Sequence, residues 1–135
     1  MSANNKELVK RFFNEVLTQR KTGVADQIFH SDFVHHSFPV TTKGPQAMKD
    51  SVNIFLPAFP DLKAFVEEAI EEGDTVSTKG YWTGTHKGVF MGIPSTGKNV
   101  NVKYIDMWKI KDGKLYESWV QMDNAGLMQQ LGVIK

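Results

Sequence analysis

Two stretches of alternating residues, 100–110 and 115–122, flank the dipeptide Asp112-Gly113. Asp-Gly is favoured in two-residue turns because both turn positions need a positive φ, which Asp tolerates and Gly adopts freely. Alternation of apolar and polar residues is the period of a half-buried strand. The sequence therefore predicts an antiparallel hairpin here, and any fold of this chain must include an antiparallel sheet.

An earlier turn signal predicts a second hairpin. The dipeptide Gly73-Asp74 separates residues 62–72 from residues 75–86, which have strand-like composition. Residues 62–72 also fit a helical period, so their assignment as a strand depends on the turn that follows them. A glycine-rich loop, residues 88–99, then leads into the last hairpin.

The amino-terminal half has helical patterns instead. Asn4 and Glu7 form a variant of the capping box, and the two apolar rows that follow lie on one wide face of a helix that Gly23 can end. These rows are Leu8, Phe12 and Val16, and Val9, Phe13 and Leu17. The further expected elements are a short helix at 24–31, an extended piece at 33–38, a helix from Gly44-Pro45 to Pro57 and a short helix at 126–131.

Helices that precede an antiparallel meander define the α+β class. The length of 135 residues fits one domain, 1–135, and leaves no room for two cores of ordinary size. Hydrophobic residues make up 41% and charged residues 23%, close to the averages for globular domains, so disorder is not expected.

The overall charge and residue usage exclude several classes of function. A net charge of +1 with no dense Lys/Arg run argues against a nucleic-acid partner. The absence of cysteine excludes disulfides, thiolate zinc sites and cysteine nucleophiles. No stretch approaches the roughly 18 apolar residues of a spanning helix, so no membrane association is expected. The amino terminus lacks the pattern of a secretory signal, and the expected location is the cytoplasm.

The strand at 115–122 carries an unusual mixture of side chains on one predicted face. Counting every second residue from Leu115 places Glu117, Trp119, Gln121 and Asp123 together. An unpaired buried carboxylate is too costly for a plain core, so this face is either exposed to solvent or the wall of a pocket.

The preceding strand repeats this mixture with Asp106 and Trp108. Across the turn, their face is expected to lie beside Trp119 and Gln121, so that Asp106 and Asp123 approach one another. Neighbouring carboxylates in an apolar cleft have raised pKa values, which suits a general acid or base at neutral pH. The alternative for Asp106 is a carboxylate satisfied by a nearby hydroxyl, amide or lysine.

The four histidines and several aromatic residues give less specific indications. Adjacent His35 and His36 point to opposite sides of an extended segment, so one is expected to face inward and the other water. No pair of histidines has helical metal-binding spacing, and no metal is expected. The aromatic residues Phe13, Phe55 and Phe59 are core or pocket lining, and the sequence does not separate these roles.

Several motifs together resemble one family, the SnoaL-like polyketide cyclases, which are also called predicted ester cyclases. They lie at Phe59-Pro60-Asp61, 66–74, 84–88, 92–98, 112–119 and 123–132, and so extend over most of the chain.

The resemblance implies the cone of the nuclear-transport-factor-2-like (NTF2-like, or cystatin-like) superfamily, in which a curved antiparallel sheet wraps around the amino-terminal helix. It makes residues 62–72 a strand, and it implies a deep pocket and a homodimer. Members of this family close a ring of aromatic polyketides by an intramolecular aldol reaction without a metal or cofactor. The expected partner is therefore a small hydrophobic carbonyl compound.

The resemblance also implies roles for individual residues. Asp123, at the end of the last strand, matches the acid/base aspartate, and His36 matches a common histidine expected to face the pocket. Ser118 stands where many relatives have histidine. The candidate substrate-binding residues are Trp119, Gln121, Asp106, Trp108, Phe13, Phe55, Phe59, Tyr81 and His86. The alternatives are a non-catalytic ligand-binding or dimerisation module and a hydrolase or isomerase of another lipid-like molecule.

Overall fold

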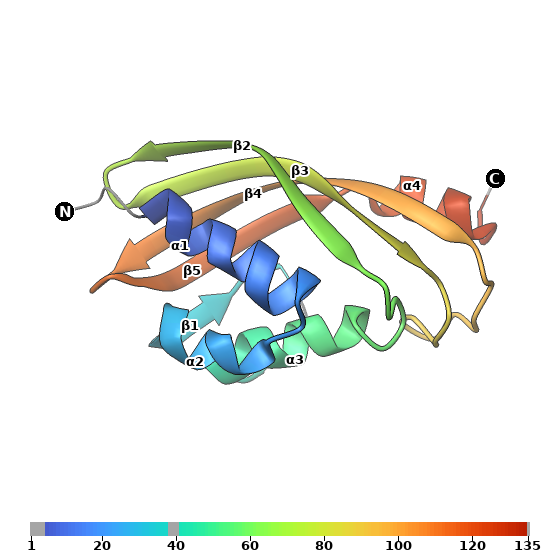
Figure 1. Cartoon of the computed structure of the whole chain (residues 1–135), viewed down its shortest axis with the longest axis horizontal. Helices are drawn as coiled ribbons and strands as arrows, with labels where there is room; N and C mark the ends of the chain where they lie inside the picture. The colour runs from blue at the N-terminus through green and yellow to red at the C-terminus, as the bar shows by residue number, and fades with distance from the viewer. Residues whose placement is uncertain (1–4, 38–40, 135) are drawn as a thin grey trace.

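The computed structural model describes residues 5–37 and 41–134, so the predictions that involve Asn4 and Phe38 lie outside the described residues. Five strands form one sheet in the order β1-β5-β4-β3-β2 (Figure 1). The strands are β1 (Phe29–His35), β2 (Lys63–Glu72), β3 (Thr75–Thr85), β4 (Asn99–Lys111) and β5 (Lys114–Met122). The helices are α1 (Asn5–Arg11), α2 (Ala25–Ile28), α3 (Pro45–Phe55) and α4 (Asn124–Leu131), with a π-helical segment η1 (Phe12–Thr18) and a 3₁₀ turn η2 (Thr22–Val24).

The sheet curves over α1, and α2 and α3 lie on the same side, which forms an α+β fold (Figure 1). Both predicted hairpins are confirmed, because β2 pairs with β3 and β4 pairs with β5 in antiparallel register. At the tip of the second hairpin, Asp112 and Gly113 have φ of 53° and 73°, the positive values that the turn requires.

The edge of the sheet differs from the expected antiparallel arrangement. Residues 29–35 pair with β5 in parallel, so the sheet is mixed. The predicted helix at 24–31 accordingly ends at Ile28, where β1 takes over. The helical pattern there is weak. Pairing of this segment with β5 satisfies backbone groups of β5 that would otherwise form an open sheet edge.

The amino-terminal helix widens in its second half. The backbone N–H of Gln19 donates to the carbonyl of Asn14, five residues back, at 2.9 Å. The apolar face expected from the sequence is confirmed, since Val9 and Val16 are fully buried against the sheet and their neighbours Phe12 and Phe13 are nearly so. π-helical turns are uncommon and often occur at functional sites. Here the widened segment carries residues that line the cavity described below.

A close approach between β2 and β3 depends on Gly80. A Cβ atom at this position would lie 1.9 Å from the carbonyl oxygen of Phe65, so only glycine fits. The pairing shifts register beside this point, between Val66 and Glu68. The same carbonyl accepts a hydrogen bond of 2.9 Å from the hydroxyl of Tyr104 on β4. This bond fixes one wall of the interior.

Within residues 5–37 and 41–134, no helix has both the length and the apolar character needed to cross a lipid bilayer.

Candidate active site

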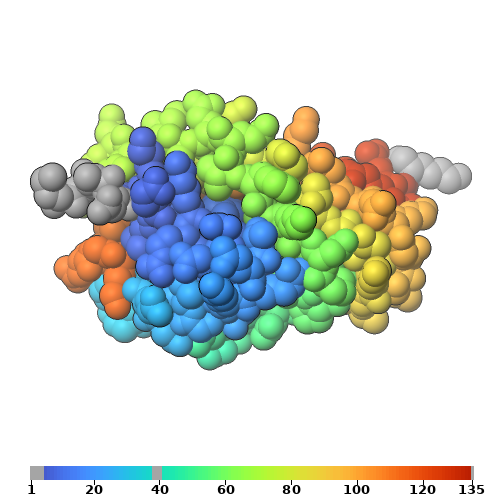
Figure 2. Space-filling view, viewed as in Figure 1, coloured from blue at the N-terminus to red at the C-terminus, as the bar shows by residue number. Residues whose placement is uncertain are grey.

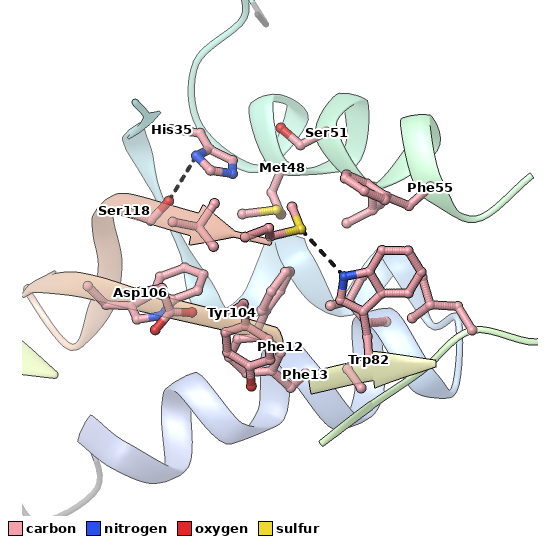
Figure 3. A pocket seen from close by; sticks show the side chains of 17 residues that line it. Phe12, Phe13, His35, Met48, Ser51, Phe55, Trp82, Tyr104, Asp106 and Ser118 are labelled. Atoms are coloured by element: carbon pink, nitrogen blue, oxygen red, sulfur yellow. Dashed lines mark hydrogen bonds between the residues drawn. The ribbon is translucent and has the colours of Figure 1, made fainter. Parts of the chain in front are cut away.

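A cavity of about 80 Å³ lies between the inner face of the sheet and the amino-terminal helices. Aromatic and aliphatic side chains from η1, α3 and strands β3 to β5 make most of its lining (Figure 3). The side chains of the helices and of β2 close over the interior on the side seen in Figure 2. The polar side chains in the lining are His35, Ser51, Tyr104, Asp106 and Ser118.

Asp106 is the carboxylate of this cavity, and it is only 4% exposed. Its Oδ1 accepts a bond of 3.2 Å from the backbone N–H of Thr78 and a second, short bond from the Thr78 hydroxyl. Burial raises the pKa of Asp106 to about 6, although the bonds from Thr78 and the indole of Trp108 act in the opposite direction. The group therefore changes charge just below neutral pH, as a general acid/base requires.

Trp108 lies two residues farther along β4 and faces the same cavity. Its ring is held among three phenylalanines, with ring centroids 5.2 Å from Phe12 and 6.2 Å from both Phe13 and Phe29. The indole Nε1 is buried and makes no hydrogen bond of ordinary geometry with any described residue, although it lies close enough to the Asp106 carboxylate to lower its pKa. A buried donor left fully without a partner would cost about 1–3 kcal/mol, so this donor is only weakly satisfied.

A histidine and a serine form a second polar group in the lining. The Nδ1 atom of His35 lies 3.2 Å from the hydroxyl oxygen of Ser118 (Figure 3). Burial, reinforced by the neighbouring His36, lowers the pKa of His35 to about 4. His35 is therefore neutral at pH 7, so its imidazole can share hydrogen bonds but does not bring a positive charge into the cavity.

Two further polar side chains of the lining already donate hydrogen bonds within the protein. The hydroxyl of Tyr104 donates to the backbone of β2, and burial together with the charge of Asp106 raises its pKa, so it stays protonated. The indole N–H of Trp82 points to the sulfur of Met122 at 3.4 Å (Figure 3). These groups shape the cavity without titrating near neutral pH.

The prediction that Trp119 and Gln121 share a face with Asp106 is wrong. In the register of the hairpin, Lys109 pairs with Glu117 but Ile110 pairs with Leu115, so β5 contains one extra residue between them. Such a bulge changes the phase of side-chain alternation. Counting from Leu115 therefore assigns the later residues of β5 to the wrong face. Trp119 and Gln121 are exposed on the outer face.

Asp123 lies outside the cavity and is exposed. Its Oδ1 accepts a hydrogen bond of 2.8 Å from the backbone N–H of Gly126, which makes it the N-cap of α4. The expected place of Asp123 on the pocket wall is thus wrong. Its catalytic role stays a prediction, to be tested against Asp106.

The two adjacent histidines lie on opposite sides of β1, as expected, but it is His35 that faces inward. His36 is exposed and lines a separate groove on the outer side, so the expectation that it faces the pocket is wrong. Its Nε2 lies 3.0 Å from a carboxylate oxygen of Glu117, and its ring stacks on Trp119 with centroids 4.7 Å apart.

Of the remaining predicted binding residues, Phe13 and Phe55 line the cavity and three do not. Phe59 is fully buried in the core, where it packs edge-on against Trp82. His86 is fully buried below the loop that follows β3, with Nδ1 3.0 Å from the hydroxyl of Thr96. Tyr81 stacks on Phe65, its neighbour across β2 and β3.

Several lining residues were not singled out from the sequence. Ser118, Val120 and Met122 share the face of β5 that packs towards the helices, and this face lines the cavity. Met48, Ser51 and Val52 lie on the buried face of α3, whose apolar spacing does carry a signal. No sequence pattern indicates that Thr78 would hold Asp106, because that contact joins β3 to β4 across the sheet.

The site and fold thus define a class of small α+β proteins with an apolar cavity that holds one carboxylate. Sequence comparison adds the family. The SnoaL-like polyketide cyclase family matches residues 7–131, and the chain belongs to this family.

Two relatives with assigned reactions are similar over most of their length. Aklanonic acid methyl ester cyclase DauD of Streptomyces sp. (strain C5) is 29% identical over 131 residues, covering 93% of this chain and 80% of the relative. The nogalonic acid methyl ester cyclase of Streptomyces nogalater is 27% identical over 118 residues, covering 83% of this chain and 86% of the relative. Among solved structures, TsrD from Streptomyces laurentii superposes with a TM-score of 0.90 at 26% identity, covering 98% and 97% of the two chains.

Proposed function

We propose that this protein is a cyclase or isomerase that catalyses an intramolecular aldol-type reaction on a small hydrophobic carbonyl compound, with Asp106 as the acid/base. The observation that carries the proposal is a single carboxylate with a pKa of about 6 in an otherwise apolar cavity. The similarity to aklanonic acid methyl ester cyclase and nogalonic acid methyl ester cyclase favours the same type of chemistry.

The chemistry needs only one carboxylate. Above its pKa, Asp106 removes a proton from a carbon atom that lies between two carbonyl groups, and the resulting enolate carbon attacks a second carbonyl carbon of the same molecule. A carbon–carbon bond forms, the attacked carbonyl oxygen becomes an alkoxide, and Asp106 returns its proton to that oxygen. The product is an isomer of the substrate, so no further reactant is required.

The surroundings of Asp106 support this role. The Thr78 bonds to Oδ1 fix the plane of the carboxylate and leave Oδ2 as the oxygen that would exchange a proton with the ligand. The aromatic lining excludes water, which would otherwise protonate the enolate before the ring closes.

The size of the cavity favours a small substrate. Pockets for drug-sized ligands measure about 300–1,000 Å³, whereas this one measures about 80 Å³. A compact 1,3-dicarbonyl compound fits this scale better, and a larger substrate would need η1 and α3 to move apart.

The first experiment compares the wild type with Asp106→Asn and Asp123→Asn. The assay measures loss of the central proton of ethyl 2-methylacetoacetate in D₂O by NMR, and ring closure of aklanonic acid methyl ester and nogalonic acid methyl ester by chromatography. We expect Asp106→Asn to lower the rate roughly 10²–10⁴-fold, the usual contribution of a general acid/base. Asp123→Asn, which keeps an N-cap side chain, should stay near the wild-type rate.

Each result decides between the two carboxylates. If Asp123→Asn abolishes turnover and Asp106→Asn does not, the acid/base is Asp123 as the family resemblance implies. If the wild type accelerates none of these reactions over buffer, the proposed function is wrong and the cavity belongs to a binding module.

We also propose that the outer face of the sheet binds a second copy of this chain. This face carries large apolar side chains that are 37–61% exposed and come from strands β2, β4 and β5. They are Phe65, Ile70, Ile105, Met107 and Trp119. An apolar face of this kind typically marks an interaction surface.

Light scattering after size exclusion tests the dimer. We expect a dimeric wild type and a monomeric Ile105→Lys variant, because a lysine would bury its charge in the interface. Val89→Lys is the matched control, since Val89 is 67% exposed in the loop after β3 and not on the sheet face. A monomeric wild type would refute the proposal.

A further inference from the structure

Two buried side-chain nitrogens among the described residues make no hydrogen bond of ordinary geometry, Nε2 of His86 and Nε1 of Trp108. His86 lies below a loop and does not line the cavity, whereas Trp108 does. The weakly satisfied donor of Trp108, beside Asp106, is therefore within reach of a ligand in the cavity.

The two indoles of the cavity differ in this respect. Trp82 satisfies its N–H on the sulfur of Met122 at 3.4 Å. Trp108 makes no hydrogen bond of ordinary geometry, and the acceptor near its N–H is the Asp106 carboxylate, while its ring is fixed in place by Phe12, Phe13 and Phe29. A donor that is held rigidly and only weakly paired in a largely apolar cavity is suited to an acceptor that arrives with a ligand.

The position of this donor relative to Asp106 limits what the ligand can be. Asp106 and Trp108 are two residues apart on β4, so their side chains lie on the same face and are neighbours in the cavity. A carbon acid that gives its proton to Asp106 carries a carbonyl group bonded to the reacting carbon, so its carbonyl oxygen lies two bonds from that carbon. That oxygen becomes negatively charged when the proton leaves.

We propose that the indole N–H of Trp108 binds this carbonyl oxygen and stabilises it as the enolate forms. Trp108 is then a catalytic residue that hydrogen-bonds the substrate, in addition to any stacking against it. The inference rests on the proposed function and deepens it, because it names the ligand class as a compound with an acceptor oxygen next to an acidic C–H group. A hydrogen bond to an enolate is stronger than one to a neutral carbonyl, so the contact favours the transition state.

The contact can be observed in the wild-type protein by NMR of the three indole N–H groups. Trp82→Phe and Trp119→Phe assign the signals by difference, so Trp108 itself need not be replaced. The probe is 2,4-pentanedione, and cyclohexane serves as a ligand without oxygen. The methyl signals of Met48 and Met122, which line the cavity, report whether each compound is bound.

We expect 2,4-pentanedione to shift the signal of the Trp108 indole proton downfield by more than the signals of Trp82 or Trp119. Cyclohexane should cause no downfield shift of this signal. Binding of 2,4-pentanedione without the shift overturns the inference. Failure of 2,4-pentanedione to enter the cavity at any concentration also overturns it, since the ligand class would be wrong.

Kinetics separate a direct contact from an indirect one. We expect Trp108→Phe to slow proton exchange of ethyl 2-methylacetoacetate roughly 10²-fold, the scale of one lost enolate or oxyanion donor, with KM changed much less than kcat. The loss should persist at about pH 9, where Asp106 is ionised in either protein. If the loss disappears there, Trp108 acts only by tuning Asp106 and the inference is wrong.

The inference and the proposed function can fail separately. If Asp106→Asn abolishes exchange while Trp108→Phe does not slow it, the acid/base role of Asp106 is supported and the contact with the Trp108 indole is refuted. If the wild type does not catalyse exchange but 2,4-pentanedione still shifts the Trp108 signal, binding of an oxygen at Trp108 is supported and the proposed reaction is refuted.

Discussion

The two faces of the sheet carry the same kinds of residues with different properties. The inner face has His35, Trp108 and Asp106, all less than 9% exposed. The outer face has His36, Trp119 and Glu117, where a histidine pairs with a carboxylate at 3.0 Å and stacks on an indole in contact with water. On the inner face, burial raises the pKa of Asp106 and lowers that of His35. Residue type alone therefore does not define this site; exclusion of water does.

The largest difference between the faces should be in the pH dependence of activity. Since the pKa of Asp106 is raised to about 6, its carboxylate is the base above that pH and is neutral below it. We expect kcat/KM to fall about tenfold for each pH unit below this value, and Glu117→Gln on the outer face to leave the profile unchanged. An activity that is flat between about pH 7 and pH 4 would contradict the role of the inner face.

Replacing the tryptophan of each face by alanine should lower the stability of the protein by different amounts. We expect Trp108→Ala to lower the free energy of unfolding by about 3–5 kcal/mol, because it opens a cavity beside three phenylalanines. With both changes made in the Ile105→Lys background, where the outer face is expected to be uncovered, Trp119→Ala should cost about 1 kcal/mol or less, since that ring is 37% exposed. Urea unfolding at one protein concentration measures both, and equal losses would show that the faces are packed alike.

The buried histidine and the buried aspartate should affect stability at acid pH in opposite directions. The pKa of His35 is lowered from 6.5 to about 4, so the unfolded chain binds its proton first and stability falls as the pH drops through this window. The pKa of Asp106 is raised from 3.8 to about 6, so its contribution is fully present below 3.8 and is lost as the pH rises through 6. Each amounts to about 3 kcal/mol.

The two contributions nearly cancel in the wild type between about pH 7 and pH 4. We expect Asp106→Asn to expose a loss of stability on acidification in this range, and His35→Gln to expose a gain. Urea midpoints at four or so pH values measure these slopes. Gln121→Ala, which replaces a side chain without a titrating group on the outer face, is the control and should leave the slope as it is. Slopes of the same sign in both inner-face variants would show that the two groups are not buried as described.

The sequence predicted the elements of this fold better than the site. Both hairpin turns and the buried face of the first helix follow from local patterns that few tertiary contacts override. The parallel edge strand β1 does not, because its pairing with β5 joins segments some 80 residues apart. At the site, one extra residue in β5 moved Ser118 to the inner face and Trp119 to the outer one. A bulge of this kind leaves no mark in the hydrophobic pattern, so every second residue beyond it was assigned to the wrong side.

The smallest expected effect on stability concerns Asp123, and it tests whether this residue acts in catalysis or only caps a helix. As the N-cap of α4, it accepts a hydrogen bond of 2.8 Å from Gly126 N–H. We expect Asp123→Ala to cost about 1 kcal/mol of stability, and Asp123→Asn to cost a few tenths, because asparagine caps a helix nearly as well. Thermal unfolding measures both. A capping role predicts that the loss of stability follows the hydrogen-bonding ability of the side chain and that activity, scaled to folded protein, stays at the wild-type level in both variants. A catalytic role predicts that both variants lose activity alike, because asparagine cannot carry the proton. The comparison of alanine with asparagine thus separates the two roles at a position where strand order and family resemblance alone would place the reaction.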